Sequence, residues 1–137
     1  MSNPRRQARR LAMQGLYQIQ ITGYESDGVL KQFLSGEYIG NADIPYFKEL
    51  LMNVDKEESS LLKLVEPFLD RPVREIDPVE RAILLIGSYE MVHRLDIPFR
   101  VVIAEGIELA KEFGAAESYR YVNSILDALK SYRDSDN

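Results

Sequence analysis

Four arginines near the start of the chain are the strongest candidates for a chemical site. Arg5, Arg6, Arg9 and Arg10 lie in the first 24 residues, which contain no acidic residue. The formal net charge of the chain is -5, and the other 113 residues, with 13 basic and 22 acidic side chains, have a net charge of -9. A positive patch at one end of an acidic protein indicates a localised anion site. We expect that anion to be the phosphate backbone of a nucleic acid.

The spacing of these arginines places them on one helix. Apolar residues recur at i, i+3, i+4 and i+7 over residues 5–21, which predicts an amphipathic helix on which the arginines form two adjacent columns. An ordinary solvated face is the alternative, but no glutamate is interleaved to give the usual i, i+4 pairs, and this favours ligand binding. The side opposite the core should carry a single stripe of Arg6, Arg10, Met13 and Tyr17.

Two other groups of residues could add to such a site. Tyr17, in line with the arginine stripe, could stack on a base, contact a protein, or lie at the boundary with its hydroxyl in water. The turn from Phe113 to Tyr121 should place polar side chains at a helix N-terminus, where free N–H groups attract anions. These side chains are Ser118, Tyr119 and Arg120, and this pattern is the less specific of the two.

The residues available for catalysis are few. The chain has no cysteine, no glycine-rich phosphate loop and no G-x-S-x-G motif, and Glu105 and Glu108 are spaced as ordinary surface charge. Glu90-x-x-His93 is part of a di-iron ligand set, but with one histidine only a symmetric dimer could complete it. We expect Glu90 to be a buried, hydrogen-bonded carboxylate and His93 to lie at a helix C-terminus. The sequence therefore predicts a noncatalytic protein without a metal or other cofactor.

Composition limits the class of protein. A chain of 137 residues with 45% hydrophobic and 28% charged residues is typical of one globular domain with a real core. The lack of cysteine excludes disulfides and is compatible with a reducing compartment. The apolar run at residues 82–86 is far shorter than the roughly 20 residues that span a bilayer, and no signal-peptide core follows the arginines. We therefore expect a cytoplasmic protein.

The apolar periodicity predicts an all-α fold with six or seven helices. After the first helix, a short one should run through residues 29–34. A long helix should then start at Asp43, with Pro45 in its first turn, and continue to about Leu69. Its length would make it the backbone of two packed halves.

The second half of the chain has equally clear helix signals. Asp77 and Pro78 begin a helix that is apolar nearly all round and ends near His93. Another should follow Pro98 and end at Gly114 in a left-handed cap. The last should begin near residues 117–118 and bury one apolar side.

The order of these motifs resembles the NusB family of bacterial transcription antitermination factors over nearly the whole chain. Ala104 and Ser124 depart from residues common in that family. The matching stretches are Arg5–Arg9 with Leu16-Tyr17, Tyr46-Phe47 with Leu50-Leu51, Val79–Leu84 with Tyr89-Glu90, Ile97–Gly114, and Tyr121–Asp127.

The resemblance implies a fold, a target and a partner. The fold is a single domain over residues 1–137 with about seven helices in two perpendicular three-helix bundles, and approximate subdomains at 1–70 and 71–137. The implied target is the single-stranded boxA element of ribosomal RNA leaders. The implied partners are NusE, a small-subunit ribosomal protein, and the RNA polymerase antitermination complex.

The resemblance also implies roles for particular residues. RNA-binding positions are Arg5, Arg6, Arg9, Arg10, Phe113, Ser118, Tyr119 and Arg120. Positions on or near the partner interface are Tyr17, Glu80 and Tyr121.

Two other hypotheses stay open at the level of sequence. The arginines of a protein-interaction module would meet an acidic protein surface and show no preference for boxA RNA. Members of the resembled family also differ in whether they form a homodimer through the RNA-binding face. The third hypothesis, a dimeric metallo-oxidase using Glu90 and His93, requires bound iron or manganese.

Overall fold

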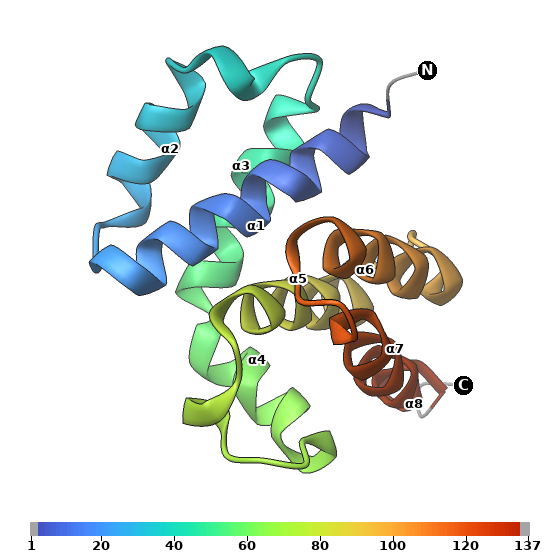
Figure 1. Cartoon of the computed structure of the whole chain (residues 1–137). Coiled ribbons are helices and arrows are strands. Elements are labelled where there is room, and N and C mark those ends of the chain that lie inside the picture. The colour runs from blue at the N-terminus through green and yellow to red at the C-terminus, as the bar shows by residue number, and fades with distance from the viewer. Residues whose placement is uncertain (1–2, 135–137) are drawn as a thin grey trace. The chain divides into compact units, whose positions relative to one another are not determined.

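All regular secondary structure in residues 3–134, which are the residues described by the computed structural model, is helical (Figure 1). Its contacts divide the chain into two compact units, one up to Glu57 and one from Glu58 onward. No strand occurs in the described range, so the predicted all-α class is confirmed. The division falls earlier in the chain than the approximate subdomain boundary expected at residue 70.

Three helices and one short turn form the first unit. Asn3 caps the first helix by accepting a hydrogen bond from the backbone N–H of Arg6, and Asp43 caps the third by accepting from that of Tyr46. Gly23, with φ of 75°, ends the first helix in the left-handed conformation. The elements are α1 (Pro4–Thr22), α2 (Ser26–Leu34), the 3₁₀ turn η1 (Glu37–Ile39) and α3 (Ile44–Lys56).

Helix α1 packs against α3 and α2, and its buried surface is wider than one apolar stripe. Gly15 allows the closest approach, because a Cβ there would lie 2.8 Å from Cδ1 of Leu51 on α3. The prediction that Met13 lies opposite the core is wrong, since its side chain is only 2% exposed. More than half of the circumference of α1 is covered, and this leaves a narrower outward stripe around Arg6, Arg10 and Tyr17.

The prediction of one long helix from Asp43 to Leu69 is also wrong, because the helix is broken at Glu57. There α3 ends and α4 (Glu58–Val65) begins, with Glu57 at φ -100° and ψ 17°. Residues 55–58 are all charged, so they bury no apolar side chain that would hold a continuous helix across this point.

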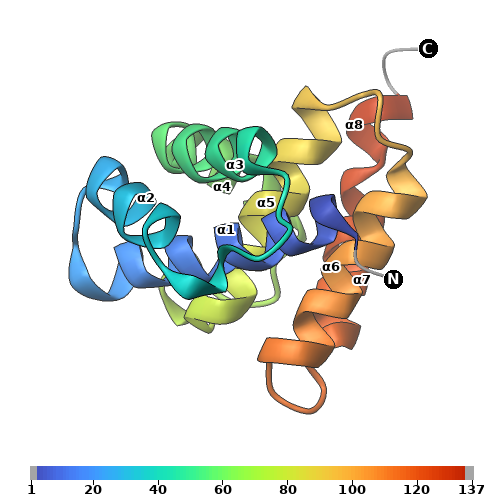
Figure 2. The same ribbon diagram turned by 90° about the horizontal axis from the view of Figure 1, so that it is seen from above.

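The second unit is built around α5. This helix (Pro78–His93) is buried continuously over residues 82–91, as its apolar composition predicts. Helices α6 (Phe99–Phe113) and α7 (Ser118–Leu129) lie side by side, joined by a short turn (Figure 2). Leu126 of α7 fills the space beside two glycines, Gly87 of α5 and Gly106 of α6. The remaining elements are the 3₁₀ turns η2 (Glu66–Phe68) and η3 (Val73–Glu75) and the single-turn α8 (Ser131–Asp134).

Two local predictions in this unit are wrong. Gly114 ends α6 with φ of -91° and ψ of 175°, which is extended rather than left-handed backbone. Glycine fits there because a Cβ would lie 2.8 Å from both the carbonyl oxygen of Ala110 and Cβ of Ser118. Glu105 is not surface charge, since it is 6% exposed.

Arg133 on α8 ties the end of the chain to the end of α5. Its guanidinium donates hydrogen bonds to the backbone carbonyls of Met91 (2.8 Å), Ile97 (2.6 Å), Glu90 (3.0 Å) and Arg94 (2.9 Å). These carbonyls belong to the last turn of α5 and the loop before α6, where a cation is favourable to the helix dipole. One side chain therefore supplies hydrogen bonds to the backbone carbonyls at the C-terminal end of α5.

We expect Arg133→Ala to lower the free energy of unfolding by about 2–4 kcal/mol, because hydrogen bonds from a charged donor are lost at several carbonyls. Arg133→Lys should retain only part of this free energy, since an ammonium group lacks the planar array of N–H donors of a guanidinium. Urea unfolding followed by circular dichroism measures both. Lys130→Ala is the control, because it removes only a surface ion pair with Asp127, and its expected loss is below about 0.5 kcal/mol. An equally small loss for Arg133→Ala would contradict the capping role.

Candidate nucleic-acid interface

The two columns of arginines on α1 have different surroundings. Arg5 and Arg9 both lie over the ring of Tyr46 on α3, with their guanidinium carbons 4.6 and 5.5 Å from its centroid. Tyr46 and Arg9 are each 3% exposed, and Nε of Arg5 also lies 4.0 Å from Oδ2 of Asp43. Cations over an aromatic face are attracted by its quadrupole, most strongly where water is excluded. This column therefore joins α1 to α3.

The other column faces away from that contact. Arg6 is exposed and Arg10 is half-buried. Nη1 of Arg10 donates a hydrogen bond of 3.1 Å to Oε1 of Gln7, and Nε2 of Gln7 donates one of 3.1 Å to the backbone carbonyl of Tyr38. The guanidinium of Arg10 is thus oriented by a side chain that also holds η1 against α1.

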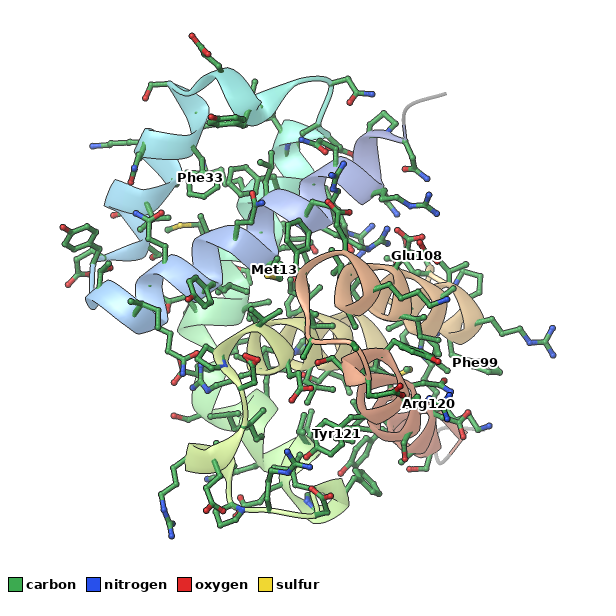
Figure 3. All side chains as sticks on the ribbon, in the orientation of Figure 1. Met13, Phe33, Phe99, Glu108, Arg120 and Tyr121 are labelled. Atoms are coloured by element: carbon green, nitrogen blue, oxygen red, sulfur yellow. The ribbon has the colours of Figure 1, made fainter. Side chains whose placement is uncertain are left out.

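A groove of about 590 Å³ continues this surface along α1. Its floor includes Phe33 of α2, whose ring lies 5.8 Å from that of Phe47 on the side of α2 that faces α1 and α3 (Figure 3). Tyr17 is 40% exposed and lines the groove as well. The prediction that Tyr17 lies in line with Arg10 and away from the core is therefore confirmed. The polar residues around it are Gln7, Arg10, Gln14, Gln18 and Thr22.

The second predicted surface surrounds the turn between α6 and α7. Nζ of Lys111 lies 5.2 Å and the guanidinium carbon of Arg120 5.6 Å from the ring centroid of Tyr119. Arg120 also donates to the Tyr119 hydroxyl at 3.2 Å and pairs with Glu117 at 2.7 Å. Because both members of that ion pair are more than two-thirds exposed, the pair is weak, and Arg120 can exchange Glu117 for a phosphate.

The other two residues predicted at this turn are less accessible. Ser118 is 4% exposed and packs against Gly114, and Phe113 is half-buried. Figure 3 shows Arg120 on the outer side of α7. The exposed chemistry of the turn is therefore that of one aromatic ring with two cations.

Two residues predicted near a partner interface, Glu80 and Tyr121, lie in one cluster of the second unit. Tyr121 points from α7 toward the segment before α5 (Figure 3), and the guanidinium carbon of Arg71 lies 4.5 Å from its ring centroid. Arg71 holds Asp70 through two hydrogen bonds, Nε to Oδ1 at 2.7 Å and Nη2 to Oδ2 at 3.2 Å. Glu80, 8% exposed, is close enough to act on the Arg71 charge.

The electrostatics of this cluster follow from those contacts. The hydrogen bonds from Arg71 hold the pKa of Asp70 below its ordinary value, and Asp70 in turn raises the pKa of Arg71. Burial raises the pKa of the Tyr121 hydroxyl. That hydroxyl is buried and makes no hydrogen bond of ordinary geometry in the part of the chain that the structure describes, although Asp70 is near enough to act on it. It therefore lies beside an ion pair without a well-formed hydrogen bond.

Comparison with known proteins identifies the family of the chain. Residues 6–131 match the NusB family model. The chain belongs to the NusB family. It is 51% identical over 125 residues to transcription antitermination protein NusB of Marinobacter nauticus, covering 91% of this chain and 79% of that protein.

Two other members of the NusB family also match this chain over most of its length. NusB of Shewanella halifaxensis is 48% identical over 125 residues, covering 91% of this chain and 93% of that one. The solved structure of NusB from T. maritima superposes with a TM-score of 0.82 at 26% identity, covering 96% of this chain and 93% of that one. NusB proteins are transcription antitermination factors and not enzymes, as predicted from the sequence.

The metal hypothesis finds no support in the geometry. Glu90 is 1% exposed, whereas His93 is exposed and lies against the ring of Tyr89, with centroids 5.1 Å apart. Within residues 3–134 no three histidine, aspartate or glutamate side chains are grouped to hold an ion. None of the helices there is long and apolar enough to cross a membrane.

Sequence reasoning missed the residues that hold the predicted ones in place. Tyr46 and Lys111 stood in the stretches that resemble the family, and Arg71 stood in no predicted element. None of the three had an assigned contact. Each is a cation or an aromatic ring, and a search for such pairs across helices could have proposed them. Tyr38 lay in a stretch of chain with no regular apolar pattern, so no sequence signal placed it beside Arg10.

We expect Tyr121→Phe to raise the free energy of unfolding by about 1 kcal/mol, because it removes a buried hydroxyl that has no well-formed hydrogen bond. Tyr119→Phe is the matched control, since the Tyr119 hydroxyl accepts a hydrogen bond from Arg120 and its loss should be neutral or slightly destabilising. Urea unfolding measures both variants. A loss of about 1 kcal/mol or more in Tyr121→Phe would show that the hydroxyl is satisfied.

Proposed function

We propose that the protein is a cytoplasmic, noncatalytic antitermination factor that binds single-stranded boxA RNA of ribosomal RNA leaders. It does so together with the ribosomal protein NusE, within an RNA polymerase complex that resists premature termination. Membership in the NusB family supports the general role. The RNA and the partner are the specific part of the proposal.

One observation supports RNA binding above all others. Arg6 and Arg10 form an outward column on α1, while the adjacent column of Arg5 and Arg9 is engaged with Tyr46. The outward column offers phosphate contacts, and the inward one fixes the helix that carries them. We therefore assign direct phosphate contact to Arg6 and Arg10 and a mainly supporting role to Arg5 and Arg9.

The second surface has the elements that single-stranded RNA binding uses. Tyr119 offers a half-buried ring, and Lys111 and Arg120 place positive charge beside it. Stacking of bases on aromatic rings next to cations is common in single-strand binding. Phe113 and Ser118 support the turn that positions this ring.

The partner contact is assigned to Tyr17 and to the cluster of Glu80 and Tyr121. Arg71 and Asp70, which are both exposed, offer charges of both signs beside the ring of Tyr121. Complementary charges across an interface favour the correct partner over others.

We expect the double variant Arg6→Ala/Arg10→Ala to weaken binding of labelled boxA RNA without loss of helicity. Since each neutralised phosphate of a single strand contributes about -0.7 to the log–log salt slope, the slope should become less steep by about 1.4. Fluorescence anisotropy over a series of salt concentrations measures the affinity and the slope, with and without the ribosomal protein.

Lys31→Ala/Lys48→Ala is the matched control, because it removes the same charge from exposed positions of the same unit. It should alter the affinity and the slope much less. Equal effects in the two double variants would indicate general charge attraction, and equal affinity for boxA and scrambled RNA with the partner present would favour a protein-interaction module or homodimer.

A further inference from the structure

The groove along α1 has features that a phosphate-binding surface alone does not need. It lies beside Arg10, and its walls come from α1, α2 and η1. With about 590 Å³ it is large enough for a small planar ligand, since ligand sites begin near 300 Å³. What it binds depends on the chemistry of these walls.

Tyr38 is the most exposed large apolar side chain in the described part of the chain, at 83%. It lines the groove, and its backbone carbonyl is held by Gln7, the same side chain that accepts a hydrogen bond from Arg10. The backbone that carries this exposed ring is therefore joined to a guanidinium through one side chain, Gln7. Stacking of a base on such a ring, with the adjacent phosphate on the cation, is the usual geometry of single-strand recognition.

The opposite wall offers hydrogen-bonding groups. Gln14 is exposed and lies one turn after Arg10 on α1, and its side chain makes no hydrogen bond in the described structure. An amide carries both donors and an acceptor, so it can match the edge of a base. Gln18 lies one turn further along, where it donates to Gln32 at 2.8 Å.

The charge of the groove favours RNA over an acidic or basic protein segment. None of its lining residues is acidic, and Arg10 is the one charged residue among them. Glu37, which precedes Tyr38, is exposed and does not line the groove. The site combines one cation, two tyrosines and three glutamines with the apolar side chains of Leu11, Ile21 and Phe33. This mixture fits the flat face and polar edge of a nucleotide better than the wholly apolar face of a helix.

We propose that this groove binds one unpaired base of the RNA, with Tyr38 as the stacking surface, Gln14 reading the base edge and Arg10 on the adjacent phosphate. This inference rests on the proposed RNA-binding function and adds base recognition to it. Phosphate contacts position a nucleic acid, whereas base contacts specify its sequence. The groove would therefore supply sequence preference that the arginines alone do not provide.

An abasic scan of boxA RNA tests this directly. Each RNA lacks one base but keeps its phosphate, and its affinity for the full chain is measured without the ribosomal protein. We expect one abasic position to cost the native chain about tenfold in affinity. Tyr38→Ala should bind intact boxA about tenfold more weakly and lose its sensitivity at that one position, while Tyr38→Phe should keep it.

The controls distinguish this inference from the proposed function. Tyr24→Ala removes another exposed tyrosine of the same unit that does not line the groove, and it should leave the scan unchanged. If Tyr38→Ala keeps the native scan while Arg6→Ala/Arg10→Ala weakens binding, the base site is overturned and RNA binding stands. If Tyr38→Ala acts only when the ribosomal protein is present, the groove is a protein site and the inference is overturned. If the arginine variant binds normally, the proposed function itself fails.

Discussion

The contact of Arg5 and Arg9 with the ring of Tyr46 is the constraint on which the proposed interface depends. Four arginines within six residues would repel one another if all faced the same solvent. Two of them lie instead over one aromatic face, which attracts cations and is itself buried. This contact holds α1 against α3, and Arg6 and Arg10 lie on the outward side of α1, with Arg10 lining the groove. The charge cluster is thereby divided into a column packed against Tyr46 and an outward column, to which the proposed phosphate contacts are assigned.

Aromatic rings orient cations at two further places in the second unit. Tyr119 lies between Lys111 and Arg120, and Tyr121 lies under Arg71. In each case the ring lowers the freedom of a long basic side chain before any ligand arrives, so less entropy is lost on binding. The same unit is stabilised by contacts of another kind, with Leu126 against two glycines and Arg133 on four backbone carbonyls. The stable core and the exposed cations are thus separate sets of residues.

The helices were predictable because local signals agree with the fold. Asp43, Asp77 and their following prolines mark helix starts that the structure reproduces, and the composition of α5 predicts its burial. Most of what failed depends on contacts between segments: the burial of Met13 and Glu105, and the extended backbone of Gly114, which close approach to Ala110 and Ser118 requires. The break at Glu57 differs, because it falls in the charged run at residues 55–58, where apolar packing does not hold the helix together. Prediction of the candidate site from the sequence has the same limit, because local patterns do not show contacts between segments. Periodicity identified the arginine columns and Tyr17, but no local pattern could show that Arg9 lies on Tyr46 or that Gln7 links Arg10 to the backbone of Tyr38.

A double-mutant cycle between Arg9 and Tyr46 is the most direct test of the division between the arginine columns. Arg9→Met keeps the apolar stem without the charge, and Tyr46→Leu keeps apolar bulk without the ring. The free energy of unfolding of the native chain, the two single variants and the double variant gives the coupling. A coupling of about 1–2 kcal/mol is predicted, because the pair is almost fully buried. A coupling near zero would show that the arginine does not depend on the ring and would contradict the account.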